Sequence, residues 1–137
     1  MRVAGSQAAF RTVDHDYPLA VARLARAHGT PTFVLNSAIG ADPGSRFFYN
    51  RVKGDLERDL AGEAFLSLTF VRPGLIGGKR MQFRLGERLL VTGLTLAGPL
   101  LPRYWRVNPA ARIAQALLAA ALNPRPGTHI VTSGQLV

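Results

Sequence analysis

The sequence contains no cysteine, which excludes a disulfide framework, a thiolate metal site and a thiol nucleophile. It also lacks a long apolar run, because the longest one, 89–102, is shorter than the about 20 residues that span a bilayer and is interrupted by glycine and proline. No apolar core of about seven residues follows Arg2, as it would in a secretory signal. These absences predict a cytoplasmic protein without a membrane segment.

Acidic residues are scarce in the second half of the chain. Residues 1–68 carry eight basic and seven acidic side chains, whereas residues 69–137 carry nine basic side chains and a single acidic one, Glu87. The net charge of the chain is +9. Such a one-sided excess suits nucleic acid, an anionic cofactor or an acidic protein segment. The basic residues are scattered and are not interleaved with aromatic ones, which disfavours nucleic acid.

The hydrophobic pattern predicts helices alternating with strands. Helices are predicted where apolar residues recur every three or four positions, at 17–28, 45–62, 79–101 and 109–123. Polar residues that can cap such helices precede three of these segments, namely Asp16, Ser45 and Asn108. Short apolar and β-branched runs predict strands at 31–36, 66–71 and 128–132.

This order of elements predicts one α/β domain with a parallel sheet of three strands and flanking helices. Strands 31–36 and 66–71 are apolar almost throughout, as expected when helices cover both faces of a sheet. The chain has 137 residues, of which 47% are hydrophobic, and no repeat or linker divides it. A single domain from residue 1 to residue 137 is therefore predicted.

Tyr49 and Lys53 are the residues that first suggest chemistry. They stand four positions apart on the predicted helix 45–62, so that their side chains share one face. An ammonium group close to a phenol favours the phenolate and lowers a pKa that is normally about 10. Tyr49 is therefore a candidate general acid/base, although such pairs also arise by chance with a core-facing ring beside a solvated lysine.

Further polar residues follow the predicted strands. Ser37 comes directly after strand 31–36, and Arg72, Pro73 and Gly74 follow strand 66–71. The carboxyl ends of parallel strands are where open α/β sheets bind ligands. These residues are therefore expected to share one rim of the sheet with the tyrosine and the lysine.

Three segments together resemble the short-chain dehydrogenase/reductase superfamily, namely Val34–Ala38, Tyr49–Gly54 and Thr69–Gly74. More narrowly, two stretches resemble atypical NAD(P)-binding members related to sugar-nucleotide epimerases and to the Tat-interacting oxidoreductase: Gly40–Asp42 upstream of Phe47–Tyr49, and Phe83-Arg84. The resemblance runs from about Gly5 to Val131.

The resemblance implies an NAD(P)-dependent oxidoreductase or epimerase-like protein that acts on a small carbonyl or hydroxyl substrate and uses no metal. Ser37 would polarise the substrate, Tyr49 would be the general acid/base, and Lys53 would bind the nicotinamide ribose. Pro73 and Gly74 would line the cofactor pocket, with Arg72 anchoring the strand end beside them. The alternative is a non-catalytic NAD(P)-sensing or protein-interaction module of the same fold. The choice between NAD and NADP is left open.

The chain departs from the superfamily in its phosphate-binding motif. The superfamily begins with a strand and a glycine-rich turn that holds the cofactor pyrophosphate, and G-x-G-x-x-G occurs nowhere in this sequence. Residues 1–137 are therefore expected to form a partial, truncated Rossmann-like domain without the first βαβ units, inactive by itself. Strand 31–36 would then expose an apolar edge, which predicts a homo-oligomer.

Overall fold

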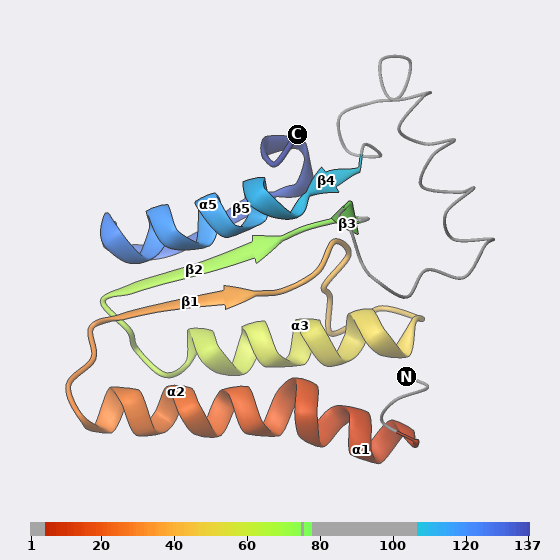
Figure 1. The fold of residues 1–137 in the computed structure, drawn as a ribbon. Coiled ribbons are helices and arrows are strands. Elements are labelled where there is room, and N and C mark those ends of the chain that lie inside the picture. Colours follow the sequence, from red (N-terminus) through yellow and green to blue (C-terminus); the bar gives the residue numbers. More distant parts are fainter. Residues whose placement is uncertain (1–4, 75, 78–106) are drawn as a thin grey trace.

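A computed structural model describes residues 5–74, 76–77 and 107–137. The predicted helical region 79–101, which includes Phe83 and Arg84, lies outside these residues. Three parallel strands form the central sheet in the order β1-β2-β5, with the bounds β1 Thr32–Asn36, β2 Ser67–Arg72 and β5 Gly127–Thr132 (Figure 1). A second, two-stranded parallel sheet joins β3 (Ile76–Gly77) to β4 (Asn108–Pro109).

Helices cover both faces of the central sheet (Figure 1). On one face lies α3 (Phe48–Ala61), next to a continuous helical segment made of α1 (Gln7–Arg11), the π-helical turn η1 (Thr12–Asp16) and α2 (Tyr17–Ala27). On the other face lies α5 (Ala110–Leu122), and the chain ends with the 3-10 turn η4 (Ser133–Gln135). The predicted α/β class, a Rossmann-like parallel sheet with three strands and flanking helices, is confirmed.

Two apolar cores result from this double coverage. Successive residues of a strand point to opposite faces of the sheet. Leu35 and Phe70 therefore pack against α2 and α3, whereas Val34 and Val71 pack against Ile113 of α5. Both strands are therefore apolar because helices cover both faces of the sheet, as predicted. Within the described part of the chain, β1 has a neighbour on one side only.

The predicted start of the first helix at Asp16 is wrong. Asp16 has helical backbone angles and makes no capping hydrogen bond, because the helix already begins ten residues earlier. Ser6 is the cap, and its side-chain oxygen accepts a hydrogen bond of 3.0 Å from the amide of Ala9. The π-helical turn Thr12–Asp16 then leads directly into α2. The polar residues that precede Pro18 in the sequence form this π-helical turn. Such turns occur frequently at functional sites.

Two other predicted caps are also corrected. The residue before α3 is Phe47, which has no side-chain cap, and Ser45 instead accepts a hydrogen bond from the amide of Phe47 at 3.2 Å. The residue before α5 is Pro109, and the side chain of Asn108 turns away from the helix to bridge two loops. Both helices exist as predicted, but the packing of the loops decides where they begin.

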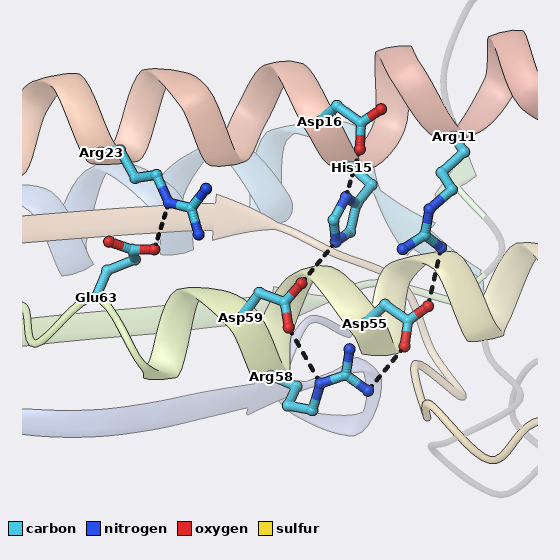
Figure 2. A network of polar contacts seen from close by, with 8 residues as sticks. All are labelled: Arg11, His15, Asp16, Arg23, Asp55, Arg58, Asp59 and Glu63. Atoms are coloured by element: carbon cyan, nitrogen blue, oxygen red, sulfur yellow. Dashed lines mark hydrogen bonds and ion pairs between the residues drawn. The ribbon is translucent and has the colours of Figure 1, made fainter.

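Polar contacts connect the first helical segment to α3 and to the turn that follows it, as Figure 2 shows. They join Arg11 to Asp55 at 2.9 Å, His15 to Asp59 at 2.9 Å and Arg23 to Glu63 at 2.7 Å. His15 is buried and also lies 2.8 Å from Asp16. Burial raises the pKa of Asp59, but hydrogen bonds and positive charge from His15 and Arg58 outweigh this effect and hold it below its usual value.

Candidate functional site

The carboxyl ends of β1 and β2 lie side by side and carry the predicted site residues. The amide of Ser37 donates to the carbonyl oxygen of Val71 at 2.7 Å, and the amide of Ile39 donates to that of Pro73 at 2.8 Å. These bonds continue the parallel ladder beyond the ends of the two strands. Ser37, Arg72 and Pro73 therefore share one rim of the sheet, as the sequence predicted.

Ser37 and Arg72 converge on a buried carboxylate from α3. The Ser37 hydroxyl donates to Glu57 Oε1 at 2.5 Å, and Arg72 Nε donates to the same oxygen at 3.0 Å. Arg72 Nη2 also donates to Glu57 Oε2, so the guanidinium and the carboxylate form a two-point contact. Ser37 is only 4% exposed, and its hydroxyl hydrogen is directed at Glu57. The hydroxyl cannot at the same time donate this hydrogen to a substrate.

Glu57 was missed by reasoning from the sequence, although a signal existed. Tyr49, Lys53 and Glu57 follow one another at intervals of four residues, so all three lie along one face of α3. The spacing that singled out Tyr49 and Lys53 therefore extends to Glu57, the one of the three that meets Ser37 and Arg72.

Lys53 is held by a carboxylate from the π-helical turn. Its Nζ donates to Asp14 Oδ1 at 2.6 Å, and the side chain of Lys53 is 11% exposed. The same Nζ is 6.0 Å from the centre of the Tyr49 ring. The ring of Tyr49 also packs against Phe10 at 5.7 Å between centroids, and Tyr49 is 40% exposed. Tyrosine and lysine are thus neighbours, as predicted, with a carboxylate added.

The predicted lowering of the Tyr49 pKa is wrong, because the pKa is raised. Partial burial and the negative charge of Asp14 raise the pKa of the Tyr49 phenol above its usual value of 10.0. The larger cause is burial, which disfavours the charged phenolate, and the negative charge of Asp14 adds to it. The phenol is therefore protonated throughout the neutral range.

The backbone groups beyond β2 are used within the fold. The Gly74 amide donates to Asn108 Oδ1 at 2.7 Å, and Asn108 Nδ2 donates to the carbonyl oxygen of Ser133 at 2.9 Å. Asn108 is fully buried and ties the end of β2 to the chain that follows β5. Pro73 and Gly74 lie at the predicted rim, but their polar atoms support neighbouring loops. No pattern in the sequence distinguished this role of Asn108 from a helix cap.

A cleft lies away from this rim, on the face of the sheet that α5 covers. This cleft of about 360 Å³ lies between α5 and the sheet, and its floor includes Thr69 and Val131. Alanine side chains of α5 leave this space open, and Arg125 is the one charged residue in its lining. It brings no pair of ionisable groups together, unlike the sheet rim, where Glu57 meets Arg72.

The fit of a nicotinamide cofactor to the rim is partial. Tyr49 and Lys53 offer a phenol and an ammonium group of the kind that can bind a nicotinamide ribose. Within the residues that the structure describes, no glycine-rich turn of the G-x-G-x-x-G kind opens a helix that could hold the pyrophosphate. Likewise, no group of three histidine or carboxylate side chains in those residues is placed to bind a metal ion.

Replacing Asp14 with asparagine should lower the pKa of Tyr49. The substitution removes a negative charge that opposes the phenolate and leaves Lys53 to stabilise it. The measurement is the tyrosinate absorbance during an alkaline titration, with Tyr49→Phe used to identify the Tyr49 component among the three tyrosines. An unchanged or higher pKa in Asp14→Asn would show that Asp14 does not control this phenol.

The same shift gives the sign of a pH effect on stability. The folded state holds the phenol in its protonated form more strongly than the unfolded chain does. The contribution of Tyr49 to stability is therefore fully present below the unfolded pKa of about 10 and is lost as the pH rises through the folded value. This loss should be smaller in Asp14→Asn.

No protein-family model matches this chain. Comparison with individual proteins does find relatives. The chain is 36% identical over 130 residues to "Protein FMP52, mitochondrial" of Coccidioides immitis, an alignment that covers 92% of this chain and 52% of that protein. It is 46% identical over 68 residues to the FMP52 protein of Eremothecium gossypii, covering 50% of this chain and 30% of that protein. It is 43% identical over 68 residues to that of Saccharomyces cerevisiae, covering 50% and 29%.

These findings correct two predictions from the sequence. The assignment to the short-chain dehydrogenase/reductase superfamily is wrong, because the relatives found carry the name FMP52 and no model of an NAD(P)-binding family matches. The predicted cytoplasmic location is wrong as well, because these relatives are named as mitochondrial proteins. The chain spans about half the length, or less, of the curated relatives it matches. None of the described helices is both long and apolar enough to cross a membrane.

Proposed function

We propose that this chain provides the proton-transferring residues of an NAD(P)-dependent oxidoreductase or epimerase-like protein. Its substrate would be a small carbonyl or hydroxyl compound. One observation carries the proposal: Tyr49 is 40% exposed, its neighbour Asn50 bonds the loop that follows β1, and its ring centre lies 6.0 Å from the ammonium group of Lys53. The rim of a parallel sheet is where ligands bind. The pyrophosphate of the cofactor would need residues other than those described.

The chemistry of Tyr49 favours one direction of proton transfer. Because its pKa is raised, the phenol is protonated at neutral pH and donates its proton to an oxygen that gains negative charge. Carbonyl reduction creates such an oxygen, and a bound nicotinamide would supply the hydride. Lys53 has three N–H donors, one of which is directed at Asp14, so it can also bind a ribose hydroxyl.

A second candidate is a non-catalytic NAD(P)-sensing or protein-interaction module. The observation that favours it is the arrangement of Ser37, whose hydroxyl is buried and donates to Glu57. Ser37 can polarise a substrate only after its hydroxyl rotates away from this carboxylate. In the second candidate the cofactor is bound and no substrate is turned over.

The test compares cofactor binding with turnover. Purified chain is titrated with NADH, NADPH and reduced nicotinamide mononucleotide, and reduced-nicotinamide fluorescence is followed. We expect the mononucleotide to bind about as well as the dinucleotides, because the described residues fit the nicotinamide end of the cofactor. No binding of any of the three would overturn the enzyme and the NAD(P)-sensing module, since each requires the nicotinamide end to be held by this chain, and would leave only the protein-interaction module.

Turnover is then measured with a panel of small aldehydes and ketones. In Tyr49→Phe the rate should fall by about 100-fold or more, with binding unchanged, because general acid/base catalysis contributes at least that factor. Tyr17→Phe is the matched control, since Tyr17 is exposed on α2 and is not part of the rim. Equal, measurable rates in wild type and Tyr49→Phe would contradict the catalytic role.

We also propose a mitochondrial location, which the names of the relatives support. A carboxyl-terminal fluorescent fusion of the gene product, expressed in its own cells, should coincide with a mitochondrial dye. A diffuse signal through the cytosol would contradict this location.

A further inference from the structure

The cleft between α5 and the sheet has one polar end and one apolar end. Its volume of about 360 Å³ lies within the range of about 300–1,000 Å³ that small-molecule sites occupy. Because α5 runs antiparallel to the strands, its last turn lies over the amino ends of β2 and β5 (Figure 1). Asn123 and Arg125 line the cleft at this end. Ala116 and Val131 line it closer to the carboxyl ends, where both pack against the core around Val71.

The cleft is open because α5 carries small side chains along its second half. Ile113 and Leu117 pack against residues of β1 and β2. Further along the helix, Ala119 and Ala120 line the cleft instead. Because their side chains end at Cβ, they do not fill the distance to the sheet as larger side chains do in a close-packed interior. Small side chains alone do not define a ligand site, so the polar groups around this space decide what it can hold.

Two buried hydroxyl residues of β2 lie at the polar end. Ser67 and Thr69 are 2% and 5% exposed, and like Val71 they point to the face of the sheet that α5 covers. The Ser67 hydroxyl has no hydrogen-bond partner among the described residues, and the side chain of Thr69, in the floor of the cleft, forms no hydrogen bond with them either. A buried hydroxyl without a partner costs free energy, and nearly all of them are paired in folded proteins. The polar end is therefore suited to a ligand group that accepts a hydrogen bond from Thr69.

The charge at the polar end is positive. Arg125 is the charged residue that lines the cleft, and none of the ion pairs formed among the described residues includes it. The described residues from 69 onwards contain no acidic side chain that could neutralise it. The carboxyl end of α5 disfavours an anion, but the helix dipole corresponds to about half a charge, whereas the guanidinium carries a full one. An anionic group is therefore expected beside Arg125.

We propose that this cleft binds an aliphatic carboxylate of medium chain length, with the carboxylate at Arg125 and Thr69 and the chain directed towards Val131. An anionic head group matches the guanidinium and the free hydroxyl, and an apolar chain matches the alanine side chains of α5. From Gly127 to Val131, β5 extends by about 13 Å, which limits the length of the chain. The site lies towards the amino ends of the strands. It is separate from the rim at their carboxyl ends and independent of the function proposed for that rim.

Calorimetric titration of the purified chain at neutral pH tests the class of ligand. Octanoate should bind with a single molecule per chain. Butanoate should bind roughly 100-fold more weakly or worse, because each additional buried methylene group strengthens binding by about fourfold. Octylammonium has the same chain with a positive head group and should not bind measurably. The proposal is refuted if octanoate does not bind, if butanoate binds as tightly, or if octylammonium binds as tightly.

Two variants test the residues of the cleft. Arg125→Gln should weaken octanoate binding by about tenfold or more, because hydrogen bonds to a charged partner are lost. Ala120→Leu should abolish binding, because the larger side chain occupies the space of the ligand. The matched controls are Arg112→Gln and Ala114→Leu, since both residues are exposed on α5 and neither lines the cleft. Unchanged octanoate binding in either test variant would refute the site.

Nuclear magnetic resonance locates the ligand on the unmodified chain. Octanoate should shift the methyl signals of Ala116, Ala120 and Val131 and leave the amide signals of Ser37 and Arg72 unchanged. Shifts confined to those two rim residues would place the ligand at the rim and overturn the proposal. Octanoate should also raise the midpoint of thermal unfolding in the wild type and not in Ala120→Leu, because a ligand stabilises only a folded chain that binds it. An equal rise in both would show that octanoate binds outside the cleft.

Discussion

Gly54→Ala should destabilise the fold by about 3 kcal/mol, at the upper end of the usual cost of overpacking. A Cβ atom on Gly54 would lie 2.2 Å from the carbonyl carbon of Asp42 and 2.3 Å from the nitrogen of Pro43. Both are backbone atoms, so no side chain can rotate to make room. The loop after β1 would have to move away from α3, and this loop follows Ser37 directly.

Urea denaturation followed by circular dichroism measures the effect as a lower midpoint with an unchanged slope. Gly62→Ala is the matched control, at the C-cap of the same helix. The nearest atom to a Cβ at Gly62 is 3.3 Å away, and the residue has ordinary helical backbone angles. The control should differ from the wild type by less than about 1 kcal/mol. Equal stability of the wild type and Gly54→Ala would refute the close packing of loop and helix.

Glu57→Ala should cost about 3 kcal/mol, because the substitution removes a buried carboxylate that neutralises a guanidinium. Glu57 is 6% exposed and accepts hydrogen bonds from Ser37 and Arg72. The Ser37 hydroxyl would then have to turn elsewhere, so the same variant should also alter any substrate contact made by Ser37.

The appropriate comparison is Glu63→Ala, which removes a carboxylate of the same kind from the ion pair with Arg23. That arginine side chain is 61% exposed, and pairs near the surface contribute about 0–1 kcal/mol. Denaturation of the two variants side by side should therefore show a clearly larger loss for Glu57→Ala. Equal losses of unfolding free energy in the two variants would mean that burial does not increase the contribution of Glu57 to stability.

The predicted strands and helices were largely correct because they depend on local patterns. Strand 31–36 is observed as β1 Thr32–Asn36 and strand 66–71 as β2 Ser67–Arg72. Helix 17–28 is observed as α2 Tyr17–Ala27, and the error lies upstream, where a continuous helix replaces the predicted start. The predicted helix boundaries were wrong where a polar residue could play either of two roles. Asn108 could cap the helix that follows it or bridge two loops, and it bridges the loops.

The candidate site was predicted in position but not in chemistry. Parallel pairing of two adjacent strands places Ser37 next to Arg72, and helical spacing places Tyr49 next to Lys53, so both neighbours followed from the sequence. The electrostatics did not follow, because Asp14 lies 39 residues from Lys53 in sequence and meets it only when the π-helical turn packs on α3. Burial of the phenol, together with the negative charge of Asp14, reverses the expected direction of the Tyr49 pKa shift.

The sequence by itself determined the α/β class, the parallel sheet and the rim on which polar side chains gather, because periodicity and spacing act over a few residues. The tertiary structure alone decided which charges neutralise one another. Ion pairs such as Asp14–Lys53 and Glu57–Arg72 depend on distances of a few ångströms between separate elements, and Coulomb energies and hydrogen bonds change steeply over that range. Spacing along a chain contains no information about such distances until the helices have packed.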